Sequence, residues 1–170
     1  MMKQSMEMIA RLGAVLSTCL VVSACGFVPL YGQGGVNQGL SAIEVHVPQG
    51  RSAYLVRESL DDSLGRDLRQ PALYRLDITV DERRFARGLR IDNVANRYEL
   101  QLKVGYKLIN KATGTVVLTG SAPVAVTYDS ADAPYGGITA QQDGQKRAAS
   151  QAAQQIQLEI SRYLAKLPKP

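Results

Sequence analysis

The sequence predicts an α+β domain, a two-layer sandwich in which a four-stranded sheet carries two helices on one face. Four segments alternate apolar and polar residues with the period of a β-strand. Two other segments repeat apolar residues every three or four positions, which is the spacing of an amphipathic helix. Each segment has a single apolar side, so the elements can bury these sides only against one another. The predicted order is β-α-β-β-β-α.

The first strand is predicted over residues 41–47, where apolar side chains occupy every second position before a Pro-Gln-Gly sequence. The first helix is predicted over residues 52–68. Ser52 is a suitable N-cap for it, and Pro71 prevents the helix from continuing. Its apolar stripe recurs every four residues and consists of Val56, Leu60, Leu64 and Leu68.

Three further strands are predicted over residues 73–82, 97–108 and 115–128. The middle one has the clearest alternation. The arginine-rich segment 83–90 is either a connection or a bulged extension of the strand before it. Pro123 lacks the N–H that a sheet ladder uses, so it predicts an edge position or a bulge in the last strand.

The second helix is predicted over residues 140–167, with an alanine- and glutamine-rich first half that can pack closely on a sheet. With both helices on one face, the opposite face of the sheet stays uncovered by this chain. Water normally covers such a face of an antiparallel sheet, and a partner protein is the alternative. The candidate partner-contact residues on this face are Arg75, Glu99, Gln101, Lys103 and Lys107.

The N-terminus has the features of a bacterial lipoprotein signal. An apolar run over residues 12–22 is too short to span a bilayer, which takes about 20 apolar residues, and has the length of a signal-peptide core. Val22 and two small residues then precede Cys25, which completes a lipobox. We expect cleavage after residue 24 and acylation of Cys25. An ordinary secretory signal with an incidental cysteine, or a buried signal anchor, is the alternative.

The chain therefore divides into a signal peptide over residues 1–24, a lipidated N-terminus and flexible tether over 25–39, and a single α+β domain over 40–170. The glycine-rich polar stretch 32–39 has the composition of a flexible linker. Removal of 24 residues from 170 leaves 146, enough for one modest core. Cys19 is lost with the signal, so the mature monomer has no disulfide.

The net charge is +5, and the signal segment contributes +1 of it, which leaves a mildly basic mature chain of +4. The residue types and their spacing favour no catalytic role. His46 is the only histidine and is interpreted as a surface residue of the first strand. We find no serine elbow, phosphate-binding loop or metal-ligand spacing. The sequence thus predicts no enzymatic activity, no metal, no cofactor and no nucleic-acid partner.

The run Cys25-Gly26-Phe27-Val28-Pro29-Leu30-Tyr31-Gly32 resembles the opening of the alphaproteobacterial LptE family of lipopolysaccharide-assembly lipoproteins. The resemblance covers the whole mature chain and extends to Arg97-Tyr98-Glu99-Leu100 and Lys146-Arg147-Ala148-Ala149. It implies an outer-membrane lipoprotein that plugs the LptD β-barrel and helps to insert lipopolysaccharide into the outer leaflet. A generic periplasmic lipoprotein that binds another envelope partner or ligand is the alternative.

If the resemblance carries over, a polar sheet face suits a barrel lumen, which is lined by polar side chains. Lipopolysaccharide carries phosphates, which arginine binds bidentately. A solvated hairpin end, with Asp81, Glu82 and Asp92 as local ion-pair partners, is the alternative to a lipid site there. Lys146 and Arg147 form a second basic candidate. The candidate lipopolysaccharide-binding residues are Arg83, Arg84, Arg87, Arg90 and Arg97.

Overall fold

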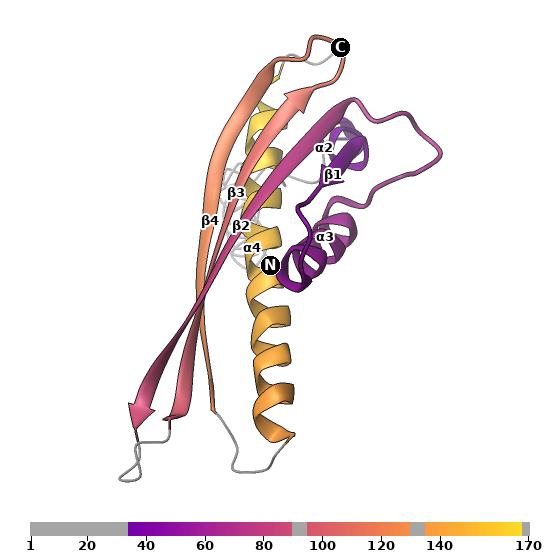
Figure 1. Cartoon of the computed structure of the whole chain (residues 1–170). Helices are drawn as coiled ribbons and strands as arrows, with labels where there is room; N and C mark the ends of the chain where they lie inside the picture. Colours follow the sequence, from indigo (N-terminus) through magenta and orange to yellow (C-terminus); the bar gives the residue numbers. More distant parts are fainter. Residues whose placement is uncertain (1–33, 90–94, 130–134, 168–170) are drawn as a thin grey trace, which may run out of the picture. The chain divides into compact units, whose positions relative to one another are not determined.

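A computed structural model describes residues 34–89, 95–129 and 135–167 of the chain (Figure 1). The chain divides into two units, and all described residues belong to the second, Gln33–Pro170. The order α-β-α-β-β-β-α confirms the predicted α+β fold and adds one short helix before the first strand. The elements are α2 (Gly34–Ser41), β1 (Ile43–His46), α3 (Arg51–Leu64), β2 (Tyr74–Leu89), β3 (Ala95–Asn110), β4 (Val116–Asp129) and α4 (Gly136–Ala165).

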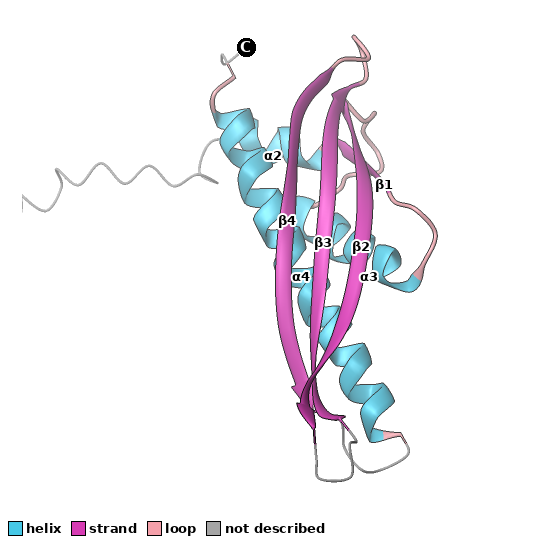
Figure 2. Ribbon diagram, turned by 60° about the vertical axis from the view of Figure 1, so that its left-hand side comes forward, coloured by secondary structure: helices cyan, strands magenta, loops and turns pink. Residues whose placement is uncertain are grey.

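The four strands form one sheet in the order β1-β2-β3-β4. β1 runs parallel to β2, and α3 is the crossover between them, whereas β2, β3 and β4 are antiparallel to one another. In Figure 2 the sheet lies in front of α3 and α4, and no described segment covers its near face. The helices therefore form one layer and the sheet the other, as the sequence predicts.

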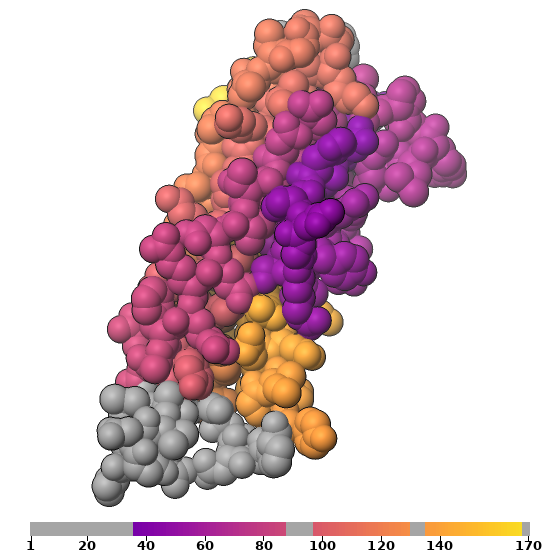
Figure 3. Space-filling model, in the orientation of Figure 1, coloured from indigo at the N-terminus to yellow at the C-terminus, as the bar shows by residue number. Residues whose placement is uncertain are grey.

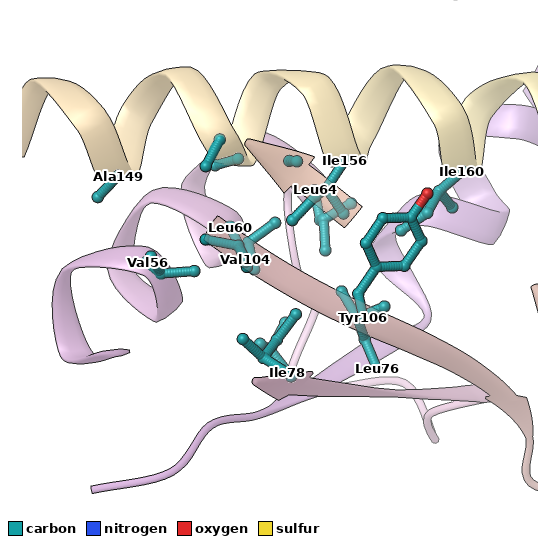
Figure 4. Packing of buried hydrophobic residues seen from close by; sticks show 14 of the residues in the cluster. Val56, Leu60, Leu64, Leu76, Ile78, Val104, Tyr106, Ala149, Ile156 and Ile160 are labelled. Carbon is teal, nitrogen blue, oxygen red and sulfur yellow. The ribbon is translucent and has the colours of Figure 1, made fainter. Parts of the chain in front are cut away.

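The core lies between these two layers. Figure 4 shows side chains of α3 and α4 pointing toward those of the strands. Leu60 and Ile156, from the two helices, are fully buried against this core, and each such side chain contributes about 1.5–3 kcal/mol relative to exposure. β3 supplies every second residue, as its alternation predicts. Its buried residues are Leu100, Leu102, Val104, Tyr106 and Leu108.

Small residues bring α4 close to the sheet. A Cβ added at Gly144 would lie 3.1 Å from Cδ1 of Tyr128 on β4, so the helix backbone passes directly over that ring. Over residues 148–153 of the helix, the buried side chains are all alanines. These are Ala148, Ala149, Ala152 and Ala153.

The first helix is shorter than the sequence predicts. α3 ends at Leu64 because Gly65 adopts the left-handed conformation, with φ 61° and ψ 46°, and donates its backbone N–H to the carbonyl of Asp61. Glycine has no Cβ to oppose this conformation. Leu68 is therefore outside the helix and 86% exposed, so its place in the predicted apolar stripe is wrong.

Ser52 is not the N-cap of α3. The residue at that position is Gly50, which makes no side-chain hydrogen bond. Ser52 instead lies inside the first turn and donates its hydroxyl to Glu82 on β2. The side chain thus joins the helix to the sheet, which a local capping rule does not anticipate.

The glycine-rich stretch is not an unordered linker throughout. Residues 34–39 are the beginning of α2, in which Val36 and Leu40 are buried in the core. A Cβ added at Gly39 would lie 2.9 Å from Cδ1 of Leu164 on α4, so glycine permits this close approach. Tertiary packing outweighs the low helix propensity of glycine here.

The arginine-rich segment is a bulged extension of the second strand, which was one of the two alternatives. β2 continues to Leu89 and pairs with β3 over this length, with register shifts on either side of Gly88. The last helix begins at Gly136, four residues before the predicted start. β2, β3, β4 and the first turns of α4 thus extend together beyond α3 (Figure 1).

Candidate functional site

The candidate site is the sheet face opposite the helices, called the open face below. Its side chains come from the alternate positions of β2, β3 and β4 that do not enter the core. Figure 3 shows much of β2 at the surface of the molecule. All five candidate partner-contact residues lie on this face, although their role in binding stays a prediction. They are Arg75, Glu99, Gln101, Lys103 and Lys107.

The centre of the open face is hollowed. The strand register aligns Asp81 with Lys103 and Pro123 in one row across the sheet. The next row aligns Arg83 with Gln101 and Ala125, and these two rows line an open hollow of about 400 Å3. The hollow is therefore polar on the β2 side and apolar on the β4 side.

Acids on the open face of β2 pair with arginines two residues along the same strand. The guanidinium of Arg75 donates to both carboxylate oxygens of Asp77, at 2.9 and 3.1 Å. The guanidinium of Arg83 contacts both carboxylate oxygens of Asp81, at 3.1 and 3.5 Å. Residues i and i+2 lie on the same side of a strand, which permits these pairs.

At the β1 edge of the sheet, Glu44 is the centre of a small charged cluster. Its carboxylate accepts from Nζ of Lys111 at 2.9 Å and lies 3.1 Å from Nε2 of His46. The hydrogen bond from Lys111, followed by that from His46, lowers the pKa of Glu44 to about 2. His46 is exposed on the strand, as predicted, and contributes to this cluster.

The part of the open face on β4 has a different character. Its outward residues are small and uncharged from the end near α2 almost to the far end of the strand. These residues are Thr119, Ser121, Pro123, Ala125 and Thr127. The open face thus has a charged part over β2 and β3 and a smooth, uncharged part over β4.

The five arginines predicted as a lipopolysaccharide site do not form one cluster. Arg84 pairs in register with the buried Leu100, so its side chain lies on the helix side of the sheet. There its Nη1 donates to Oε1 of Gln141 at 2.6 Å, and its guanidinium lies 5.1 Å from the ring centroid of Tyr98. Arg90 lies outside the described residues.

The remaining arginines lie on the open face and are paired. Nε of Arg87 donates to Glu99 at 2.8 Å, and this hydrogen bond lowers the pKa of the Glu99 carboxyl. Nε of Arg97 donates to Asp129, also at 2.8 Å. Of the acids named for the alternative of local ion pairs, Asp81 pairs with Arg83, Glu82 instead contacts Ser52 and Gln145, and Asp92 lies outside the described residues.

The second basic candidate is also partly engaged. Arg147 donates to Asp143 at 2.8 Å and to the backbone carbonyl of Thr127 at 3.2 Å, which ties α4 to β4. Lys146, next to it, is exposed. The structure therefore gives Arg147 a structural role on the side of the helix rather than a place on the open face.

Sequence reasoning missed a polar cluster between the layers. Nε of Arg51 donates to Oε1 of Gln145 at 3.1 Å, and Nε2 of Gln145 donates to Oε1 of Glu82 at 2.9 Å. Ser52 donates to the other oxygen of Glu82. The cluster fixes α3 and α4 on β2. Its signal in the sequence is that Glu82 occupies a helix-facing position, opposite Leu102.

Several predicted features lie outside the described residues. These are the signal peptide, Cys25 and the first part of the tether.

Among the described residues, no group of three or more His, Cys, Asp or Glu side chains is arranged to hold a metal ion. None of the helices that the structure describes is long and apolar enough to cross a membrane.

Comparisons with known proteins agree on the family and the fold. The family model LptE, lipopolysaccharide-assembly, matches residues 40–160. The crystal structure of a candidate lipoprotein from Caulobacter crescentus is 52% identical and covers 80% of this chain and 100% of that chain, with a TM-score of 0.70. No curated protein matches the chain.

More distant solved structures share the fold alone. Lipoprotein B from Nitrosomonas europaea is 14% identical and covers 73% of this chain and 84% of its own, with a TM-score of 0.55. Rare lipoprotein B from Shewanella oneidensis is 17% identical, covers 71% and 92%, and has a TM-score of 0.50. The layered arrangement therefore persists where little of the sequence does.

Proposed function

Because the chain belongs to the LptE family of lipopolysaccharide-assembly proteins, we propose that it is the lipoprotein subunit of an outer-membrane assembly complex. Acyl chains on Cys25 anchor it in the outer membrane, and its open face docks inside an LptD-type β-barrel. The complex helps to insert lipopolysaccharide into the outer leaflet. The subunit acts by binding and positioning, without enzymatic chemistry of its own.

The observation that carries this proposal is the open face itself. Within the described residues, both long helices cover the same side of the sheet, and the polar side chains on the other side take no part in the core. The interior of a membrane barrel is polar, so such a face matches its wall. Pro123 lies within the edge strand β4 and lacks an N–H, which disfavours the addition of a partner strand there. These features favour docking by a face rather than by an edge.

Co-purification with the barrel tests docking. Ala125→Arg places a long charged side chain on the smooth part of the open face, and we expect the variant to lose the LptD-type barrel in pull-downs from outer membranes. Gln154→Arg, at an exposed position on α4, is the matched control and should retain it. Full recovery of the barrel with Ala125→Arg would contradict docking by this face. Absence of the barrel even with the unmodified chain would favour the generic lipoprotein.

Mass spectrometry and fractionation test the anchor. The mature protein should begin at Cys25 and carry several acyl chains, each worth about 0.8 kcal/mol per buried methylene in membrane binding. Cys25→Ala should give an unacylated precursor or a soluble form. Density fractionation should place the acylated protein in the outer membrane. A mature N-terminus elsewhere, without acyl chains, would contradict this part of the proposal.

A lipopolysaccharide contact, if it uses arginine, falls to Arg83, Arg87 and Arg97 on the open face. Arg84 is exposed on the helix side of the sheet and contacts Gln141 and Tyr98 there, so it is better suited to a structural role. Arg87→Ala should reduce lipopolysaccharide capture most strongly at low salt, because exposed charges are screened by ions. Arg162→Ala, at an exposed position on α4, is the control. Equal capture by both variants would remove Arg87 from the site.

A further inference from the structure

Two lysines differ from the other charged residues of the open face. Within the described part of the chain, the remaining charged side chains on this face form ion pairs, and Lys103 and Lys107 form none. Both are exposed and lie on the central strand β3. The paired residues are Glu44, His46, Arg75, Asp77, Asp81, Arg83, Arg87, Arg97, Glu99, Lys111 and Asp129.

The lysines are unpaired although acids lie directly opposite them. The β2–β3 register places Lys103 opposite Asp81 and Lys107 opposite Asp77. Each acid instead binds an arginine of its own strand through both carboxylate oxygens. A guanidinium matches a carboxylate bidentately, which an ammonium group cannot do. The arginines therefore take the acids and leave two positive charges on β3.

The neighbouring strand β4, on the other side of β3, also places no acid opposite either lysine. On β4, Lys103 lies opposite Pro123 and Lys107 lies opposite Thr119. Between the two lysines on the open face stands Gly105, which adds no side chain. Four residues of a strand span about 13 Å. Within the described residues, the open face thus carries two lysine charges without an acid partner, about 13 Å apart, and the charged residues around them form ion pairs.

We propose that the docking partner presents carboxylates to Lys103 and Lys107, in two positions about 13 Å apart along the strand direction. This inference rests on the proposed function and specifies the chemistry of its interface. Covering a cation without supplying a counter-charge removes its hydration without compensation. A complementary acidic pair also fixes the register in which two surfaces meet. The smooth part over β4 then lies against the same wall without charged contacts.

A zero-length carbodiimide cross-link tests this in the complex of the full-length acylated chain with its barrel. The reagent activates a carboxyl group, and a lysine amine in contact with it displaces the urea by-product to form an amide. We expect Lys103 and Lys107 to form amides with Asp or Glu of the barrel, identified by peptide mass spectrometry. Lys146, which is exposed on α4, is the internal control and should form none.

Acetylation of the same samples supplies an independent readout. Lys103 and Lys107 should lose reactivity toward an acetylating reagent in the complex relative to the free chain, and Lys146 should not. A double variant, Lys103→Ala with Lys107→Ala, should bind the barrel about tenfold more weakly at low salt, with a smaller difference at high salt. Both positions point away from the core, so circular dichroism should be unchanged.

The outcomes separate the two proposals. If no barrel co-purifies with the unmodified chain, the proposed function fails and this inference fails with it. If the barrel co-purifies, but both lysines acetylate as in the free chain and form no amide, the acidic counter-surface is wrong while the proposed function stands. Binding of the double variant at full strength at all salt concentrations would likewise overturn the acidic counter-surface.

Discussion

The two faces of the sheet use the same three long strands for different purposes. The covered face is continuous and apolar over most of its length, and its residues are held by α3 and α4. On the open face, charged side chains are held by one another, and on β4 they are replaced by small ones. Adjacent residues such as Gln101 and Leu102 therefore experience unrelated constraints. The covered face determines whether the chain folds, and the open face is free to meet the requirements of a partner.

The largest expected contrast between the faces is a truncation on β3. Leu102→Ala should lower the free energy of unfolding by about 2–5 kcal/mol, because it leaves a cavity between the layers. Gln101→Ala, one residue away on the open face, should change it by less than about 0.5 kcal/mol. Urea unfolding of the non-acylated protein measures both. Equal losses would mean that the two faces are not energetically distinct.

A pair of glycines sharpens the comparison. A Cβ added at Gly120 would lie 2.4 Å from the hydroxyl oxygen of Tyr106, a buried residue whose hydroxyl donates to the carboxylate of Glu159. Gly120→Ala should therefore destabilise the protein by about 1–3 kcal/mol. At Gly105, on the open face, the Cβ would lie 2.5 Å from Oγ1 and 3.9 Å from Cβ of Thr79, an exposed side chain that can change its rotamer. Gly105→Ala should be nearly neutral in the same unfolding assay.

The smallest expected effect is the loss of folding stability at acid pH that arises from Glu44 on the open face. Glu44 has a pKa of about 2 in the folded protein and a reference value of 4.5. The folded state therefore binds its proton less readily than the unfolded state does. Its contribution to stability is complete above about pH 4.5 and is lost as the pH falls toward 2.

This contribution is modest because the side chain of Glu44 is 42% exposed. Glu44→Gln should flatten the pH dependence of the unfolding midpoint between pH 4.5 and pH 2, and Glu58→Gln, at an exposed position on α3, should leave it unchanged. An identical slope in the Glu44 variant and the unmodified protein would show that the cluster around Glu44 does not hold its charge in the folded state.

The alternation of residues along each strand was sufficient to predict which side chains lie on each face of the sheet. It was insufficient to predict the long-range contacts that hold the elements together. Alternation along residues 97–108 assigned each side chain of β3 correctly, because side-chain direction in a strand depends only on position. The helix α2 could not be predicted in this way. Its glycines disfavour a helix, and it depends on contact with Leu164, more than 100 residues later in the chain.

The same limit applies to the candidate site. The sequence identified Lys103 and Lys107 as open-face residues, but their unpaired state depends on the register of β2 against β3 and on the choice of Arg75 and Arg83 by the acids. The charge of Arg84 groups it with the neighbouring arginines in the sequence. The alternation of β2 sends it to the other side of the sheet, where it packs on Tyr98.

Pro123 also bears on self-association. A long edge strand with free N–H and C=O groups is a template on which identical chains can stack into continuous sheets. In β4 the proline removes one donor near the middle of the strand, and the guanidinium of Arg147 occupies the carbonyl of Thr127 further along. A second copy would find the ladder interrupted at both places. The β4 edge can therefore stay uncovered by this chain without recruiting further copies into a fibril.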